Sequence, residues 1–211
     1  MKAKILLVDT NFSAKPIYDY LIKTDAEVFV VGGNPQDALA KSVKNYVNID
    51  YSDILELKNY IKNSRIDYLV PGGNDLSYKI CSEINAELNF FNIDPIEVDQ
   101  IISNKEQYRK FCASINLHVP QIINYENIIK HIPVIVKPVD AFSGHGITVL
   151  YEFDKKRIDH ALNYAKKNSK SQKYLIEEFV KGQLFSHSAF IVNGEILIDF
   201  IVEEHCIVNP Y

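Results

Sequence analysis

The chain has 211 residues, 47% of them apolar and 24% charged, with a formal net charge of −4 at pH 7 and a pI near 5.9. That length allows one substantial domain or two small ones, and the composition is that of a soluble globular protein. The acidic balance argues against a nucleic-acid-binding surface, which favours a basic face. The N-terminal apolar run is too short for a signal peptide and no segment approaches transmembrane length, so no membrane partner is expected.

Short apolar runs alternate with helical patterns through the first 88 residues. This alternation predicts βαβ units and a parallel sheet. Ser13 and Ser52 are the predicted N-caps of two of the helices. Strands are expected at residues 4–8, 27–31, 46–49 and 67–70, and helices at residues 15–23, 36–41, 53–62 and 76–88.

Polar turns, two of them glycine-bearing, follow the first, second and fourth strands, at residues 9–11, 32–35 and 71–75. Because the carboxyl ends of parallel strands share one edge of a sheet, these turns mark the edge where such folds bind ligands. The chain has neither GxGxxG after its first strand nor GxxxxGK[ST]. A dinucleotide cofactor and a P-loop are therefore both unsupported.

A boundary is expected near residues 89–99, with a small aromatic strand at Phe90 and Phe91. Ser103 or Asn104 is the expected cap of the next helix, and Ile122 is expected to begin a strand. Helices are expected at residues 105–116 and 154–167, and strands at residues 134–136, 147–150, 173–180, 184–192 and 195–202.

The last two strands flank Asn193-Gly194, the strongest short-range hairpin signal in the chain. Alternation along the second arm places Glu195, Asp199 and Glu203 on one side and apolar residues on the other. This pattern predicts a half-buried strand with an acidic outer face. A solvated face is the favoured interpretation of the three carboxylates, ahead of a metal site.

Lys137 comes directly after the strand expected at residues 134–136. Pro138 follows, and because proline cannot donate to a sheet ladder it marks the limit of the strand. A small-residue loop with Gly144 and Gly146 follows. Such a loop can bring backbone N–H groups close to phosphate oxygens, and the lysine adds a point charge. Alone, the stretch is equally compatible with an ordinary strand–turn–strand hairpin that binds nothing.

The three cysteines, Cys81, Cys112 and Cys206, are far apart and include no CxxC pair. This spacing excludes a structural zinc motif and indicates a reducing compartment, the cytoplasm. All three are expected to be buried thiols.

The order of these features resembles the ATP-grasp superfamily of ATP-dependent carboxylate ligases, over nearly the whole chain. The PGGND turn at residues 71–75 is similar to a glycine turn in carbamoyl-phosphate-synthetase-like and biotin-carboxylase-like members. Asn104-Lys105 resembles the segment that carries the family's first nucleotide lysine. IVKPVDAFSGHGI and LIEEFVKG resemble the strand lysine with its phosphate loop and the segment that holds adenine.

The resemblance implies an α/β chain with a Rossmann-like pre-ATP-grasp domain and parallel sheet at residues 1–94. An incomplete α+β ATP-grasp domain follows at 95–211, with its first subdomain at about 104–176 and the truncated start of the second at about 177–211. In the implied ATP site two lysines hold the phosphates, while the Glu177 carbonyl and the Val180 amide meet adenine. The implied nucleotide-binding residues are Lys105, Lys137, Ser143, Gly144, His145, Gly146, Glu177, Glu178, Phe179 and Val180.

Two departures from the family pattern qualify this assignment. Leu184 stands where many relatives carry a glutamate that holds the ribose hydroxyls. The family's magnesium ligands, a late Asp or Glu and a Glu-x-Asn pair, lie farther beyond the adenine segment than this chain extends. The resemblance thus implies ATP as the ligand, and Mg²⁺ for the complete enzyme with its ligands outside this chain. It assigns no catalytic residue.

Two functions stay open at this point. The chain is the N-terminal portion of a ligase that activates a small carboxylate as an acyl phosphate for attack by an amine, or it is a non-catalytic, degenerate nucleotide-binding module of a split enzyme. A homodimer and a completing C-terminal chain are the protein partners considered.

Overall fold

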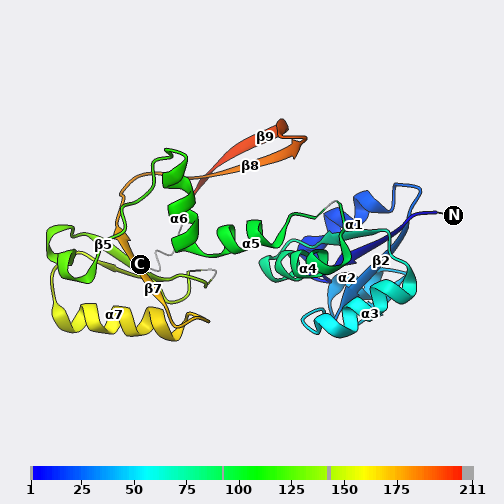
Figure 1. Cartoon of the computed structure of the whole chain (residues 1–211), viewed down its shortest axis with the longest axis horizontal. Coiled ribbons are helices and arrows are strands. Elements are labelled where there is room, and N and C mark those ends of the chain that lie inside the picture. The colour runs from blue at the N-terminus through cyan, green and yellow to red at the C-terminus, as the bar shows by residue number, and fades with distance from the viewer. Residues whose placement is uncertain (1, 92, 142–143, 206–211) are drawn as a thin grey trace. The chain divides into compact units, whose positions relative to one another are not determined.

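The computed structural model describes residues 2–91, 93–141 and 144–205. The chain divides into two compact units, residues 1–103 and 104–211 (Figure 1). The predicted domain limits at residues 94 and 95 stay a prediction. Within the described ranges, no helix combines the length and apolarity needed to cross a membrane.

Unit 1 is built on a four-stranded sheet in the order β3-β2-β1-β4, and all three pairings are parallel, as predicted. Successive residues of β1 enter opposite hydrophobic clusters: Leu6 lies in one and Leu7 in the other. Helices therefore cover both faces of the sheet. The strands are β1 (Lys4–Val8), β2 (Glu27–Gly32), β3 (Tyr46–Asn48) and β4 (Tyr68–Pro71), and the helices are α1 (Lys15–Leu21), α2 (Ala38–Ser42), α3 (Ile54–Ser64), α4 (Asp75–Leu88) and α5 (Ile96–Ser103).

Both serine N-caps predicted in unit 1 are wrong. A 3₁₀ turn, η1 (Phe12–Ala14), precedes α1, and the side chain of Asn11 accepts the N–H of Ser13 at 3.2 Å. At the start of α3 the carboxylate of Asp53 accepts the N–H of Glu56 at 3.0 Å. The Ser52 hydroxyl is used otherwise, because it donates to Asp50 Oδ1 at 2.8 Å. Asn and Asp side chains cap helices as well as serine does, so a serine near the start of a helix does not by itself identify the capping residue.

The predicted aromatic strand at Phe90 and Phe91 is also wrong. Phe90 is buried in the hydrophobic core of unit 1, and the Phe91 ring meets Tyr68 edge to face with centroids 5.5 Å apart. These residues pack by their side chains and pair with no strand. Helix α5 has no counterpart among the predicted elements, although Pro95 just before it is a typical helix-start residue.

Unit 2 contains a three-stranded antiparallel sheet in the order β6-β5-β7, which includes the predicted strand–turn–strand hairpin. One sheet face packs on α7 (Lys155–Lys167), which lies along it in Figure 1. The predicted apolar stripe of α7, Ile158, Ala161, Leu162 and Ala165, is buried there. The other elements are α6 (Lys105–Ser114), the 3₁₀ helix η2 (Tyr125–Lys130), β5 (Val134–Pro138), β6 (Thr148–Leu150) and β7 (Tyr174–Glu178).

The predicted hairpin is present as β8 (Leu184–Val192) and β9 (Glu195–Glu204). Asn193 and Gly194 both have positive φ, as a type I′ turn requires. The predicted half-burial of the second arm is wrong. Every residue of β9 is exposed, because no element in the described part of the chain covers either face of the ribbon.

Two of the predicted buried thiols, Cys81 and Cys112, are confirmed, and Cys206 lies outside the described residues. Burial raises the pKa of the Cys81 thiol, and a protonated thiol is a poor nucleophile. We therefore expect iodoacetamide to leave Cys81 unmodified in the native chain and to alkylate it in denaturant, as read by peptide mass spectrometry. Native labelling at the denatured rate would contradict this burial.

Candidate functional site

Charged residues gather on the face of the unit 2 sheet that is turned away from α7. The register places Ile135 opposite both Val149 and Glu177, and side chains alternate along each strand. Lys137, two residues after Ile135, therefore shares this face with Glu177. The face toward α7 carries apolar residues instead.

The buried carboxylate of Glu177 links this face to α6. Its side chain is 1% exposed, and its Oε1 accepts a hydrogen bond from Nε of Arg109 at 2.7 Å. Its Oε2 forms an ion pair with Nζ of Lys137, which is itself 12% exposed. A carboxylate this deeply buried is tolerated because it is paired on both oxygens.

Lys105 adds a third cation from the first turn of α6. Asn104 caps this helix by accepting the N–H groups of Glu106 and Gln107 at 3.0 and 3.1 Å, which confirms it as the cap. The Lys105 ammonium donates to the carbonyl of Ala141 at 2.6 Å. Burial, followed by the like charge of Lys137, lowers the pKa of Lys105.

The positive charges at this face outnumber the negative ones. Arg109 and Lys137 pair with the carboxylate of Glu177, and the charges of Asp140 and Glu177 both act on the nearby ammonium of Lys105, so three cations face two carboxylates. The Asp140 carboxylate is fixed in place by neutral donors: it accepts the Ser169 hydroxyl at 2.6 Å and the N–H groups of Lys170 and Ser171 at 3.1 and 2.9 Å. A partly buried excess of positive charge favours a ligand that carries several negative charges.

The glycine loop after β5 depends on its glycines. Gly144 and Gly146 have φ of +73° and +78°, a region that side chains with Cβ rarely adopt. A Cβ on Gly146 would lie 2.7 Å from Pro138 Cγ and from Asn168 Cβ. His145 is exposed, and Ser143 lies outside the described residues. This loop comes next in the chain after β5, the strand that carries Lys137.

At the end of β7, successive residues direct their backbone N–H and C=O groups to opposite sides of the strand. The Phe179 N–H donates to the Pro133 carbonyl at 3.0 Å, and hydrogen-bonded pairs recur every second residue of an antiparallel ladder. The N–H and C=O of Glu177 therefore face Ile135. Glu178 points the other way, and its N–H donates to the Gln121 carbonyl at 3.0 Å. The carbonyl of Glu178 consequently leaves β7 on the side away from β5, where residues 121–123 lie, and Val180 follows two residues later, beyond the end of the strand.

The expected strand at Ile122 is reduced to an isolated bridge with Glu177.

The sequence motifs did single out Lys105, Lys137 and Glu177, which the fold brings together. Arg109 was missed. Its signal was the four-residue spacing from Lys105, which puts both side chains on one face of α6.

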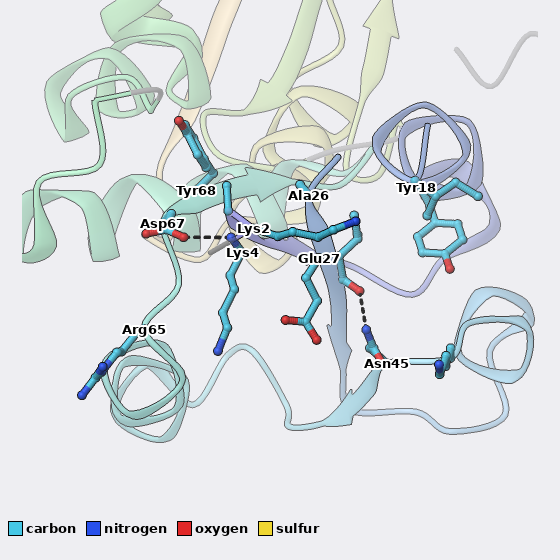
Figure 2. Close-up of a pocket in the computed structure, with 13 residues that line it drawn as sticks. Lys2, Lys4, Tyr18, Ala26, Glu27, Asn45, Arg65, Asp67 and Tyr68 are labelled. Atoms are coloured by element: carbon cyan, nitrogen blue, oxygen red, sulfur yellow. Dashed lines mark hydrogen bonds between the residues drawn. The ribbon is translucent and has the colours of Figure 1, made fainter. Parts of the chain in front are cut away.

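Unit 1 offers two other polar regions. At the carboxyl edge of its sheet the predicted turns meet: Asn74 Nδ2 donates to Asp9 Oδ2 at 2.7 Å, and the Thr10 hydroxyl donates to Asp37 Oδ2 at 2.6 Å. At the opposite edge lies an open hollow (Figure 2), where the Lys4 N–H donates to Asp67 Oδ2 at 2.8 Å. The polar groups named at these two edges are hydrogen-bonded to one another, whereas the cations of unit 2 are partly buried and outnumber their carboxylate partners, so the cation cluster of unit 2 is the stronger site.

A metal ion finds no suitable ligand set in this part of the protein. Within the described ranges, no group of three or more His, Cys, Asp or Glu side chains is arranged to hold one. Glu177 and Asp140, the carboxylates nearest the cluster, already have partners. The described residues therefore do not fit Mg²⁺.

No protein-family model matches the chain. The formate-dependent phosphoribosylglycinamide formyltransferase of Mannheimia succiniciproducens is 23% identical over 189 residues, which cover 84% of this chain and 47% of that protein. The chain thus spans about half the length of the curated relatives it matches.

Solved structures show the same partial coverage. The phosphoribosylglycinamide synthetase of Anaerococcus prevotii aligns with a TM-score of 0.70 at 15% identity, over 100% of this chain and 54% of that one. The N5-carboxyaminoimidazole synthetase of Staphylococcus aureus complexed with ADP aligns with a TM-score of 0.68 at 15% identity, over 98% of this chain and 56% of that one. These similarities confirm the predicted α/β fold class and the resemblance drawn from the sequence motifs.

Proposed function

The chain has the fold of the N-terminal part of an ATP-grasp ligase, and we propose on that basis that it binds ATP in unit 2. The observation that carries the proposal is the cluster of Lys105, Arg109 and Lys137 around one buried carboxylate, beside a glycine loop. A polyphosphate supplies the negative charge that this cluster lacks. The structural relative that was solved with ADP supports a nucleotide as the ligand.

In the proposed complex, Lys105 and Lys137 contact the phosphates, and each charge-assisted contact contributes roughly 1.5–3 kcal/mol. Backbone N–H groups of residues 144–146 approach the terminal phosphates. The Glu178 carbonyl accepts from the adenine amino group, and the Val180 amide donates to a ring nitrogen. Glu178 takes the role expected for the Glu177 carbonyl, because the latter faces Ile135 within the sheet.

The whole enzyme to which this fold belongs is proposed to transfer the γ-phosphoryl group of ATP to an oxygen of a small carboxylate. That step forms an acyl phosphate and ADP, and an amine then attacks the acyl carbon and releases phosphate. The formate dependence stated in the names of the curated relatives supports a carboxylate substrate. The free, buried thiols support a reducing, cytoplasmic location.

A non-catalytic nucleotide-binding module is the second candidate. It is favoured by the lack of a metal-ligand cluster among the described residues. A completing C-terminal chain or a homodimer would be its partner. If the chain is part of a ligase, we expect ATP hydrolysis or acyl phosphate formation once the completing polypeptide is present. If it is a non-catalytic module, we expect ATP binding without turnover.

Titration calorimetry with a non-hydrolysable ATP analogue tests the binding site. We expect Lys137→Ala to weaken affinity roughly 10- to 100-fold, from the loss of one charge-assisted contact. Lys105→Ala should act similarly, and its ammonium is not an ion-pair partner of Glu177. Lys110→Ala is the matched control, because Lys110 lies on the same helix, is 61% exposed and pairs with Glu106. Equal affinity in all four proteins, with folding verified by circular dichroism, would refute the site.

A further inference from the structure

Arg109 reaches from α6 to the buried carboxylate of Glu177. Its side chain is 19% exposed, and its Nε donates to Glu177 Oε1 at 2.7 Å. Among the described residues, Glu177 is the only hydrogen-bond or ion-pair partner of this side chain. The polar contacts of Arg109 are therefore confined to the carboxylate that also holds Lys137.

The two oxygens of Glu177 are held in different ways. Oε1 accepts a hydrogen bond from Arg109, whereas Oε2 forms an ion pair with the Lys137 ammonium. No donor of the described residues makes a hydrogen bond to Oε2. An ammonium rotates its N–H donors about the Cε–Nζ bond, so its attachment to a carboxylate is less directional than that of a planar guanidinium. Lys137 is thus the partner that can turn toward a ligand, and Arg109 is the partner that keeps the carboxylate in place.

A phosphate and Glu177 compete for the Lys137 ammonium. Glu177 is 1% exposed, and a carboxylate buried this deeply requires a counter-charge. If Lys137 were its only cation, the ammonium would leave the carboxylate unpaired on passing to a phosphate. Lys105 does not take over, because its ammonium donates to the Ala141 carbonyl and forms no ion pair with Glu177 in the described ranges. Arg109 is the cation that can compensate Glu177 while Lys137 binds a ligand.

We infer that Arg109 is a positioning residue of the phosphate site: it holds the Glu177 carboxylate, which leaves the Lys137 ammonium free to bind a nucleotide phosphate. The inference rests on the proposed function and gives a role to a residue that the sequence motifs missed. Arg109 acts on the nucleotide through Glu177 and Lys137. Without it, Lys137 is the main counter-charge of a buried carboxylate and binds phosphate less well.

Titration calorimetry with a non-hydrolysable ATP analogue tests this role. We expect Arg109→Met to weaken affinity about 10-fold, because Lys137 then stays with Glu177. Arg109→Lys should bind within about 3-fold of wild type, since the contact is made by Nε and a lysine ammonium can reach the same oxygen. Arg157→Met is the matched control and should keep wild-type affinity, because Arg157 is 59% exposed and pairs with Glu152 at the surface.

A double-mutant cycle separates positioning from a merely structural role. The Lys137→Ala chain has no ammonium to release, so adding Arg109→Met to it should weaken binding by no more than about 2-fold. A substitution that only loosened unit 2 would lower affinity by the same factor in both backgrounds. Circular dichroism and urea denaturation verify that each variant is folded.

The failure of this inference is distinguishable from that of the proposed function. With weakened binding in Lys137→Ala, the role of Arg109 would be overturned by wild-type affinity in Arg109→Met, by an equal loss in Arg109→Lys, or by an undiminished loss in the Lys137→Ala background. The proposed site would stand in all three cases. Failure of the wild-type chain to bind the analogue, or equal affinity in wild type and Lys137→Ala, would refute the proposed function and this inference together.

Discussion

Glu177→Ala is expected to lower the free energy of unfolding of unit 2 by about 3–5 kcal/mol, the usual cost of removing one member of a buried charge network. The substitution leaves the ammonium of Lys137 and the guanidinium of Arg109 without their shared carboxylate, at sites 12% and 19% exposed. Urea denaturation followed by circular dichroism measures the effect. It would be among the largest destabilisations that a single substitution produces in this chain.

Glu152→Ala is the matched control, because Glu152 is 71% exposed and pairs with a surface arginine. Its denaturation midpoint should barely change, as is usual for exposed ion pairs. A second arm replaces the whole network, with Glu177→Leu, Arg109→Met and Lys137→Met combined. Because apolar replacement of a complete buried network is often close to neutral, this triple variant should recover most of the lost stability. A midpoint for Glu177→Ala equal to that of the control would show that the network is not buried in solution.

Gly146→Ala is the second substitution with a large expected effect, a loss of about 2–4 kcal/mol from backbone strain and overpacking together. Its φ of +78° is strained for any residue with a Cβ, and the new methyl group would meet Pro138 Cγ and Asn168 Cβ at 2.7 Å. The glycine loop would have to move, so affinity for an ATP analogue should fall as well.

Gly182→Ala provides the control for both readouts, since no atom lies within 4 Å of a Cβ placed there. Denaturation and calorimetric titration should leave this variant close to wild type. If Gly146→Ala behaved in the same way, the loop conformation described for residues 144–146 would be incorrect.

Most of the fold could be predicted from the sequence because many of its elements depend on short-range signals. The Asn193-Gly194 turn, the apolar stripe of α7 and the Pro138 limit of β5 are each determined by a few neighbouring residues. The caps of η1 and α3, Asn11 and Asp53, were missed because Asn, Asp and Ser within two positions are nearly equivalent acceptors. Helix α5 is short, and its pattern is easily taken for a linker.

The candidate site was predictable only in part, for a different reason. The family order of motifs identified Lys105 and Lys137, but it assigned Glu177 by its backbone. The side chain proves to be the centre of the cluster through a contact with Arg109, 68 residues away. No local pattern encodes a pairing of that span. The direction of the Glu177 and Glu178 carbonyls likewise depends on the sheet register, which a strand prediction alone leaves undetermined.

The β8-β9 ribbon has a consequence for the behaviour of the protein in solution. Phe190, Ile198 and Phe200, three of its large apolar residues, are 60–68% exposed, and an isolated two-stranded ribbon is at best marginally stable in water. Its backbone hydrogen bonds therefore open easily unless another surface covers them. Amide hydrogen exchange in residues 184–204 thus reports on assembly: fast exchange marks an uncovered ribbon, and protection marks one that has found its packing partner.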